Sequence, residues 1–282
     1  VLIMAKISNK AKHRVSQAIL LTVIFLLIVM LIYPLIMALW NSFKSDIEYE
    51  RSKWYPTFPL RYKNLISGFN ATYGYILNTL FVAFCGILGM LLISSMAAFA
   101  FTKIRFPGKM ILFYVVIALM MVPSVMTLIP AYLLYRSIGL YDNLWSLILP
   151  MWTSACVNAV FLLVIFTAGL PNELFEAAQL DGAGVFFAFI KIALPLAMPI
   201  LGTLAIMQIV SVWNDYMWPR IILTEERFTI SAGLLITFTS DYTANMPVMF
   251  ASYLISSTPL LLLFIFAKNL YIEGLTSAGI KL

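Results

Sequence analysis

Few side chains in this sequence are of the types that enzymes use to break bonds. Its one histidine, His13, lies in a basic N-terminal tail, and its two cysteines, Cys85 and Cys156, lie inside apolar runs. Neither a metal-binding spacing nor a nucleophile–base–acid set can be assembled from these residues. The Gly-Lys pair at 108–109 lacks the earlier glycine of a phosphate-binding loop. We therefore expect no catalytic residue, no metal site and no cofactor on this chain.

Charged residues concentrate instead in one stretch between two apolar blocks. The stretch ELFEAAQLDGAG holds the acids Glu173, Glu176 and Asp181 and the glycines Gly182 and Gly184. Gly182 predicts a helix break, because glycine tolerates the positive φ of a sharp bend. Two short amphipathic helices around that bend would project from the apolar segments and suit a groove on a cytoplasmic partner. An amphipathic loop lying at a membrane interface explains the pattern about equally well.

Helical spacing distributes the side chains of the first short helix. Asn172 is placed to cap this helix, and Glu173 lies in its first turn, at the positive end of the helix dipole. The two faces follow from i, i+3, i+4 spacing: one holds Leu174, Ala177 and Ala178, and the more exposed one holds Glu176, Gln179 and Asp181.

A second polar group lies in SVWNDYMWP, residues 211–219, where Asn214 and Asp215 follow Trp213. A charged side chain near the end of a membrane helix costs less than one at mid-depth. Two interpretations stay open. The group is either a polar cluster at a helix end below an aromatic belt, which we favour slightly, or part of a solute pathway together with Gln208.

The elements that carry these groups are strongly apolar. The chain is 62% hydrophobic and 11% charged, with a mean hydropathy of +0.97, whereas soluble domains have about 25% charged residues. Segments near the roughly 20 residues needed to cross a bilayer lie at 17–40, 75–101, 110–134, 144–168, 195–219 and 249–272. We expect an all-α integral membrane protein with six transmembrane helices in one domain, 1–282.

Basic residues near the segment ends predict the orientation, because cytoplasmic loops are enriched in Lys and Arg. Such residues precede the first segment and crowd 103–109. We therefore expect both termini and the 169–194 loop inside, and loops 41–74 and 220–248 outside. The 41–74 loop runs against the rule, since it carries Lys44, Arg51, Lys53, Arg61 and Lys63. The net charge of +6 does not indicate nucleic-acid binding, because no basic face or recognition motif accompanies it.

Proline and small residues indicate how the helices bend and pack. Pro195 and Pro199 are expected in the first turns of the fifth segment, and Pro123 and Pro130 should each kink the third. A small-residue face on the second segment should allow close helix contact; it consists of Ser94, Ser95, Ala97, Ala98 and Ala100.

One motif in the charged stretch resembles a known family signature. Glu176-Ala177-Ala178, three residues, Gly182, nine residues, Ile192, one residue and Leu194-Pro195 resemble the EAA signature of ABC importer permeases. The stretches LPNELFEAAQLDGAG, WNDYMWP and GLTSAGIKL look like the carbohydrate, maltose-type (MalG-like) branch. The last three residues, 280–282, depart from the glycine-rich ending usual in that branch.

This resemblance implies a type I ABC importer permease fold and a sugar or oligosaccharide import function. It implies that Glu173, Glu176, Ala177, Ala178, Asp181, Gly182 and Gly184 couple the chain to ATP-binding subunits. The implied partners are a second homologous permease, two ATPase subunits that hold ATP and Mg, an extracytoplasmic solute-binding protein and membrane lipid, in a bacterial or archaeal cell membrane. The alternative is an ion-coupled secondary carrier, which would need buried ionisable residues or inverted repeats.

Overall fold

The computed structural model describes residues 2–239 and 245–279, and the side chains of residues 16–238 and 245–268. Every regular element in these residues is a helix, which confirms the expected all-α class. The elements are α1 (Leu2–Asn41), α2 (Asp46–Arg51), α3 (Lys63–Lys103), α4 (Lys109–Met120), α5 (Ser124–Ser137), α6 (Trp145–Pro150), the π-helix η1 (Met151–Ala155), α7 (Cys156–Ala168), α8 (Glu173–Leu180), α9 (Val185–Ala188), the π-helix η2 (Phe189–Ala193), α10 (Leu194–Leu196), α11 (Met198–Asn214), α12 (Met217–Ile222), the 3₁₀-helix η3 (Glu225–Arg227), α13 (Ile230–Thr239) and α14 (Met246–Gly279). The unusual ending at 280–282 lies outside the described residues.

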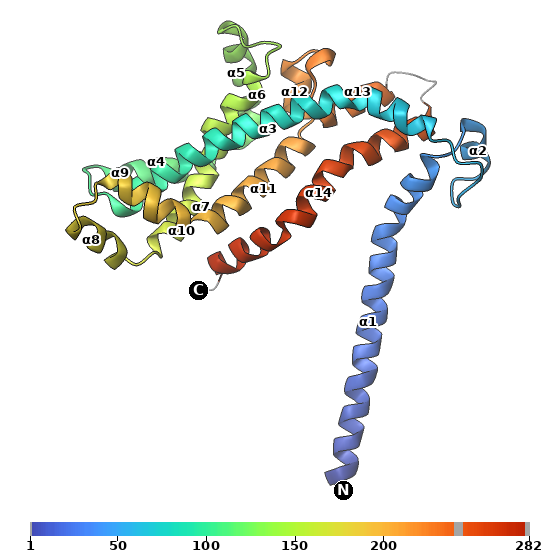
Figure 1. The fold of residues 1–282 in the computed structure, drawn as a ribbon, viewed down its shortest axis with the longest axis horizontal. Coiled ribbons are helices and arrows are strands. Elements are labelled where there is room, and N and C mark those ends of the chain that lie inside the picture. The colour runs from blue at the N-terminus through green and yellow to red at the C-terminus, as the bar shows by residue number, and fades with distance from the viewer. Residues whose placement is uncertain (1, 240–244, 280–282) are drawn as a thin grey trace. The chain divides into compact units, whose positions relative to one another are not determined.

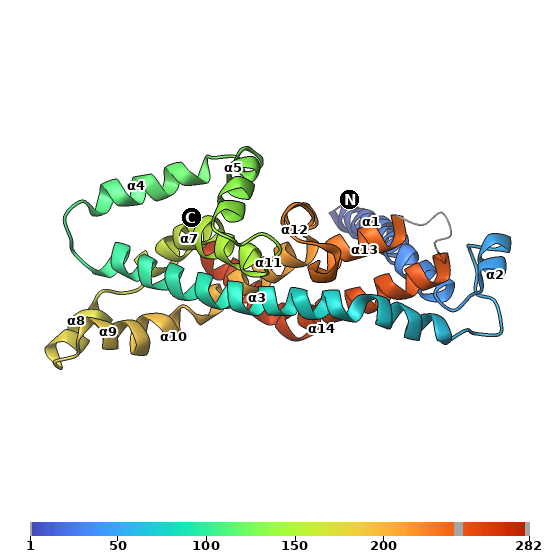
Figure 2. The ribbon, with the colours of Figure 1, turned by 90° about the horizontal axis from the view of Figure 1, so that it is seen from above.

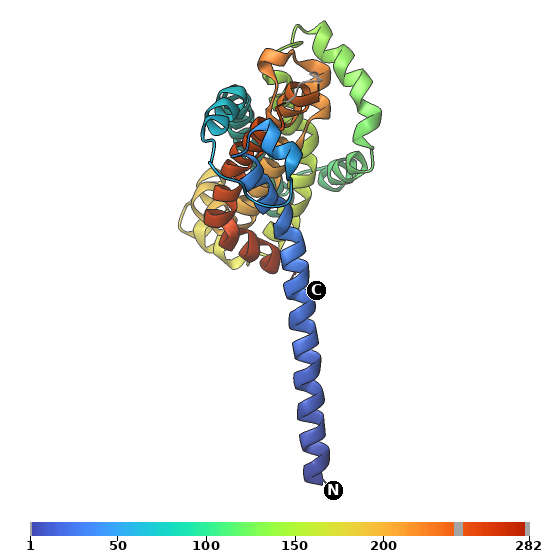
Figure 3. The same ribbon diagram turned by 90° about the vertical axis from the view of Figure 1, so that its right-hand side faces the viewer.

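Four described segments are long and apolar enough to cross a membrane: Ser16–Asn41, Lys63–Lys103, Trp145–Ala168 and Met246–Lys268. Two bent helix pairs complete the six expected crossings if each pair is one span. α1 is a single uninterrupted helix although it contains Pro34 (Figure 3). α3 begins at Lys63, well before the expected 75, and its 41 residues give it roughly twice the length that a 30 Å hydrocarbon layer requires.

The two bends lie at prolines or close to them. Pro123 adopts an extended conformation at the N-cap of α5, and the chain turns by 97° between α4 and α5 (Figure 2). Pro130, by contrast, stays inside α5 without a break. The second bend, of 69°, separates Val185–Leu196 from α11. Pro199 lies in the first turn of α11, as expected. Pro195 lies in α10, before the bend, and the expectation that it also opens the fifth span is wrong, because helical backbone already runs through α9 and η2 before it.

The described chain forms two compact units. One unit consists of the residues up to Asn70 together with the first part of α14, which ends at Ile255. The other unit consists of the chain from Ala71 onward together with the rest of α14. In the second unit, α7 packs against α4 and α11. Its cores include one around Met90, Ala98 and Leu163 and another formed by residues such as Val82, Ile148, Ile222 and Ala232.

The small-residue face of α3 contributes directly to this packing. Ser94, Ser95 and Ala98 are buried, while Ala97 and Ala100 are half-buried. Ser94 and Ser95 donate their hydroxyl hydrogen bonds to carbonyls of their own helix. The face can therefore be buried without leaving these hydroxyls unsatisfied.

Candidate functional site

The bend after α8 has the geometry of a Schellman motif. Gly182 has φ +80°, and its N–H donates to the carbonyl of Gln179 at 3.0 Å. The N–H of Ala183 donates to the carbonyl of Ala178 at 2.8 Å. These two bonds satisfy the last carbonyls of the helix. The expected helix break at Gly182 is confirmed, and positive φ is the physical reason for glycine there.

Gly184 differs from Gly182 in its backbone. It has φ −71° and ψ 161°, an extended conformation at the N-cap of α9. Any L-residue can adopt this conformation, and a Cβ at either glycine would meet open space. Of the two glycines in the stretch, only Gly182 is required by its conformation.

An aromatic cluster attaches the bend to the end of α3. Phe175 of α8 and Phe189 of η2 are buried against Phe99 of α3, with ring centroids 6.0 Å and 5.4 Å from it. The expected packing face is wrong, because Leu174 and Ala177 are exposed. The large ring of Phe175 has more apolar area to bury than these neighbours, and it sets the orientation of the short helix.

Lys103 fixes the entry to α8. Its ammonium group donates at 2.8 Å to the carbonyl of Leu170 and at 2.8 Å to Oδ1 of Asn172. It also lies 4.8 Å from the centroid of the Phe175 ring. The expected cap by Asn172 is wrong, because the side chain makes no capping bond to α8 and accepts from Lys103 instead. The contact joins residues far apart in the sequence, so helix-local spacing gave no signal for it.

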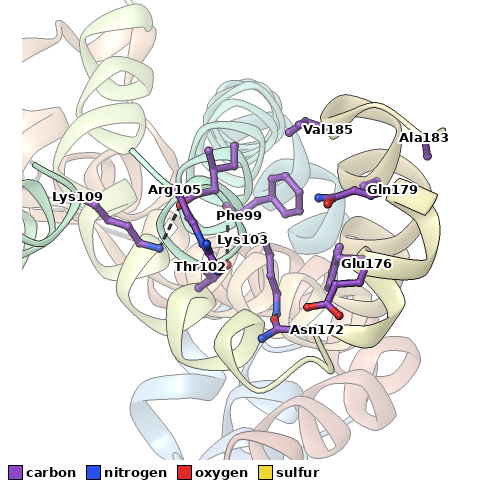
Figure 4. Close-up of a pocket in the computed structure, with 13 residues that line it drawn as sticks. Phe99, Thr102, Lys103, Arg105, Lys109, Asn172, Glu176, Gln179, Ala183 and Val185 are labelled. Atoms are coloured by element: carbon purple, nitrogen blue, oxygen red, sulfur yellow. Dashed lines mark hydrogen bonds between the residues drawn. The ribbon is translucent and has the colours of Figure 1, made fainter. Parts of the chain in front are cut away.

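A cleft of about 590 Å³ lies between this helix pair and the end of α3. Figure 4 shows Glu176 and Gln179 of α8 beside Lys103, with Arg105 and Lys109 on the other side. Glu176, Gln179 and Asp181, which were expected on the more exposed face, are all exposed, and so is Glu173.

Apolar side chains also protrude from the bend into open space. Leu180 is 89% exposed and Phe186 is 67% exposed. The combination of exposed acids, exposed apolar side chains and a fixed backbone suits the docking of a protein, whereas no group of His, Cys, Asp and Glu in the described residues could hold a metal ion.

The predicted polar group around residues 211–219 and Gln208 lies in two different environments. Trp213 is buried beside Ile230 and Leu234, and its indole N–H donates to the carbonyl of Ser256 at 3.1 Å. The amide of Asn214 donates back to the carbonyl of Val210 at 2.8 Å. Trp213 therefore contributes to packing, and the Asn214 amide donates a hydrogen bond to a backbone carbonyl at the end of α11.

Gln208 and Asp215 instead line a cavity. Together with Ser211 they form one polar stripe along α11 and its C-cap residue, Asp215, and border a space of about 230 Å³. The Asp215 carboxylate accepts from the N–H of Trp218 at 3.3 Å. The buried hydroxyl of Thr229 lines the same cavity and has no hydrogen-bond partner among the described residues.

A neighbouring cavity continues this polar stripe. Gln208 and Ser211 also border a space of about 440 Å³, where Asn158 of α7 joins them. The π-helix η1, a feature frequent at functional sites, precedes α7 and contributes Ala155 to both cavities. Sequence reasoning missed Ser211 and Asn158. For Ser211 the sequence did hold a signal, because its spacing of three residues from Gln208 places both side chains on one face of a helix.

Known proteins share both the sequence pattern and the fold. A family model described as "Binding-protein-dependent transport system inner membrane component" matches residues 89–271. "Probable ABC transporter permease protein YurM" of Bacillus subtilis is 31% identical over 92% of this chain and 86% of its own. "Arabinooligosaccharides transport system permease protein AraQ" of the same organism is 31% identical over 78% of each chain. "Diacetylchitobiose uptake system permease protein NgcG" of Streptomyces coelicolor is 28% identical over 89% and 84%.

A solved structure agrees with the fold expected from the sequence. One chain of a bacterial ABC transporter involved in the import of the acidic polysaccharide alginate superposes with a TM-score of 0.82, at 20% identity, over 91% of this chain and 96% of that chain. The matched family residues include the Gly182 bend and the polar stripe of α11. The chain belongs to the binding-protein-dependent transport system inner membrane components, the multi-pass permease subunits of ABC transporters.

Proposed function

We propose that this chain is one permease subunit of an ATP-driven importer for sugars or oligosaccharides. Arabinooligosaccharides and diacetylchitobiose stand in the names of two relatives, and a trehalose system of Mycobacterium tuberculosis supplies another relative, 30% identical over 73% of this chain. Membership of a binding-protein-dependent family disfavours the secondary-carrier alternative. The complete importer would hold a second homologous permease, two ATPase subunits with ATP and Mg, and an extracytoplasmic solute-binding protein.

The fixed bend at Gly182 is the observation that carries the coupling role. α8 and α9 form a rigid projection, held by the Schellman bonds and by the aromatic cluster on α3. In this proposal the projection docks on a cytoplasmic ATPase subunit, with Leu180 and Phe186 as apolar contacts and Glu176 facing a basic group. Glu173, Ala177, Ala178, Asp181 and Gly184 belong to the same docking surface.

Movement of the docked projection would reach the membrane helices by two routes. One route is the contact of Phe175 and Phe189 with α3, and the other is the helical backbone that runs through η2 and α10 to the bend before α11. Because α11 carries Gln208 and Ser211 and has Asp215 as its C-cap, motion at the ATPase would reposition a polar stripe that we assign to the solute path. Asn214 and Trp213 support that stripe from the end of the helix.

Cross-linking tests the docking role without depending on transport. In the assembled importer, a photo-reactive residue at Leu180 should cross-link to the ATPase subunit. The same residue at Met121, which is 80% exposed in the connection between α4 and α5, is the matched control and should not. An importer that takes up sugar normally while Leu180 forms no such cross-link would contradict the proposal.

A further inference from the structure

An uncharged aromatic segment connects α2 to α3. Residues 54–60, WYPTFPL, carry no charge and lie between Lys53 and Arg61. Trp54 is 65% exposed and Phe58 is 79% exposed. Large aromatic side chains this exposed are unusual on a surface that faces only water.

Both stems of this segment are fastened to the chain that follows α1. The N–H of Arg61 donates to the carbonyl of Phe43 at 2.8 Å. The amide of Asn64 donates to the carbonyls of Ser42 and Lys44 at 2.9 Å and 2.7 Å. On the other stem, the buried ammonium group of Lys44 donates to the carbonyl of Ser52 at 2.6 Å. The segment between these stems therefore has a defined position beside α1.

Two further bonds place the start of the segment beside the last turns of the membrane-spanning helix α1. The indole N–H of Trp40 donates to the carbonyl of Lys53 at 3.3 Å, and the hydroxyl of Tyr33 donates to the carbonyl of Trp54 at 3.4 Å. Tyr33 lies eight residues before the end of α1 at Asn41, which corresponds to about 12 Å of helix. In Figure 1 the chain after α2 turns back beside that end of α1 before α3 begins.

The depth of these contacts places the segment near the bilayer surface. The span Ser16–Asn41 has 26 residues, so its length is about 39 Å, compared with roughly 30 Å for the hydrocarbon layer and 40–45 Å with the headgroups. Trp40, one residue before the helix ends, would lie among the headgroups. The backbone at Trp54 would then lie at the boundary with the hydrocarbon.

We propose that residues 54–60 are an interfacial anchor that inserts into the headgroup layer of the leaflet at which α1 ends. Trp and Tyr favour this layer because their rings are apolar and their polar atoms remain hydrated. Pro56 and Pro59 have no backbone N–H, so fewer donors lose water on insertion. Lys53 and Arg61, one on each side, are paired with Glu50 and Glu48 but stay about half-exposed, so the charged groups lie at the edges of the segment, at the level of the lipid phosphates. The anchor does not depend on which side of the membrane this end of α1 faces.

Fluorescence depth measurements on the full chain test the anchor. In a background with Cys85→Ala and Cys156→Ala, Phe58→Cys is labelled with an environment-sensitive fluorophore and placed in nanodiscs of phosphatidylethanolamine and phosphatidylglycerol. Glu50→Cys is the matched control, because this side chain is 70% exposed on α2. The label at 58 should show blue-shifted emission and lose fluorescence when the lipids carry a nitroxide near the headgroup. The label at 50 should do neither.

Tyr55→Cys, 61% exposed in the same segment, provides a second position if the first variant fails to fold. Emission and quenching equal to those at 50, at both positions, would overturn the proposal. So would protection that arises only after the importer is assembled with its solute-binding protein, because that result would assign the segment to a protein contact.

Discussion

Replacing Gly182 with alanine isolates the backbone requirement of the proposed docking bend. The residue has φ +80°, and an added Cβ would meet nothing within 4 Å. No clash with neighbouring side chains contributes, so the cost is that of an L-residue in the left-handed region, about 1–2 kcal/mol. A cost of this size lowers the population of the bent form by a factor of about 5 to 30 relative to alternatives.

Gly184→Ala is the matched control two residues away. Its φ of −71° is open to alanine and its Cβ would also meet open space. Gly182→Asn is the expected partial rescue, because asparagine enters the left-handed region more readily than alanine.

Hydrogen exchange and transport should respond together. In the assembled importer, Gly182→Ala should speed amide exchange at positions 182 and 183, whose N–H groups make the two bonds of the motif. Sugar uptake and retention of the ATPase subunit should fall at normal expression. The control should leave exchange, uptake and retention unchanged. Equal exchange and equal uptake in Gly182→Ala and Gly184→Ala would refute the reasoning.

Four further predictions follow from the same contacts. Cysteines at Glu50 and Gln179 should react with an impermeant thiol reagent from opposite sides of the membrane, and labelling from one side would overturn the proposed orientation. Lys103→Met should loosen α8 by about 1 kcal/mol through the lost hydrogen bonds, seen as faster exchange across that helix. Trp213→Phe removes one buried hydrogen bond and should lower the yield of assembled complex, whereas Asp215→Asn should assemble normally and slow uptake. Normal assembly with slow uptake in Trp213→Phe, and poor assembly in Asp215→Asn, would contradict the packing role of Trp213 and the pathway role of Asp215. The purified chain without partners should hydrolyse no ATP, and activity free of contaminating ATPases would contradict this.

Features that depend on neighbouring residues were predictable from the sequence. Apolar length predicted the crossings, and Gly182 predicted the bend, because both depend on local chemistry. Pro123 breaks a helix as expected, whereas Pro130 does not, so proline alone did not determine where the chain bends.

Contacts between distant residues were not predictable in the same way. Lys103 binds Asn172 across many intervening residues, and this contact replaced the cap that local spacing predicted. Phe175 likewise owes its burial to Phe99 on another helix. Ser52 is buried although serine is small and polar, so the exposed Glu50 of the same loop is the position chosen for the topology experiment.

The basic residues of the 41–74 loop show why a count of charges predicts orientation only in part. Lys44 is buried, and desolvation lowers the pKa of its ammonium group while the nearby Glu48 carboxylate partly offsets this effect. Arg61 lies 3.5 Å from the carboxylate of Glu48, and Lys53 lies 3.9 Å from that of Glu50. Lys44 donates a hydrogen bond to the carbonyl of Ser52 in the same loop. A cation that is paired or hydrogen-bonded within its own folded loop contributes less to the attraction that retains free lysines and arginines on the cytoplasmic side. These contacts therefore weaken the argument that the composition of this loop makes against the outer position we expect for it.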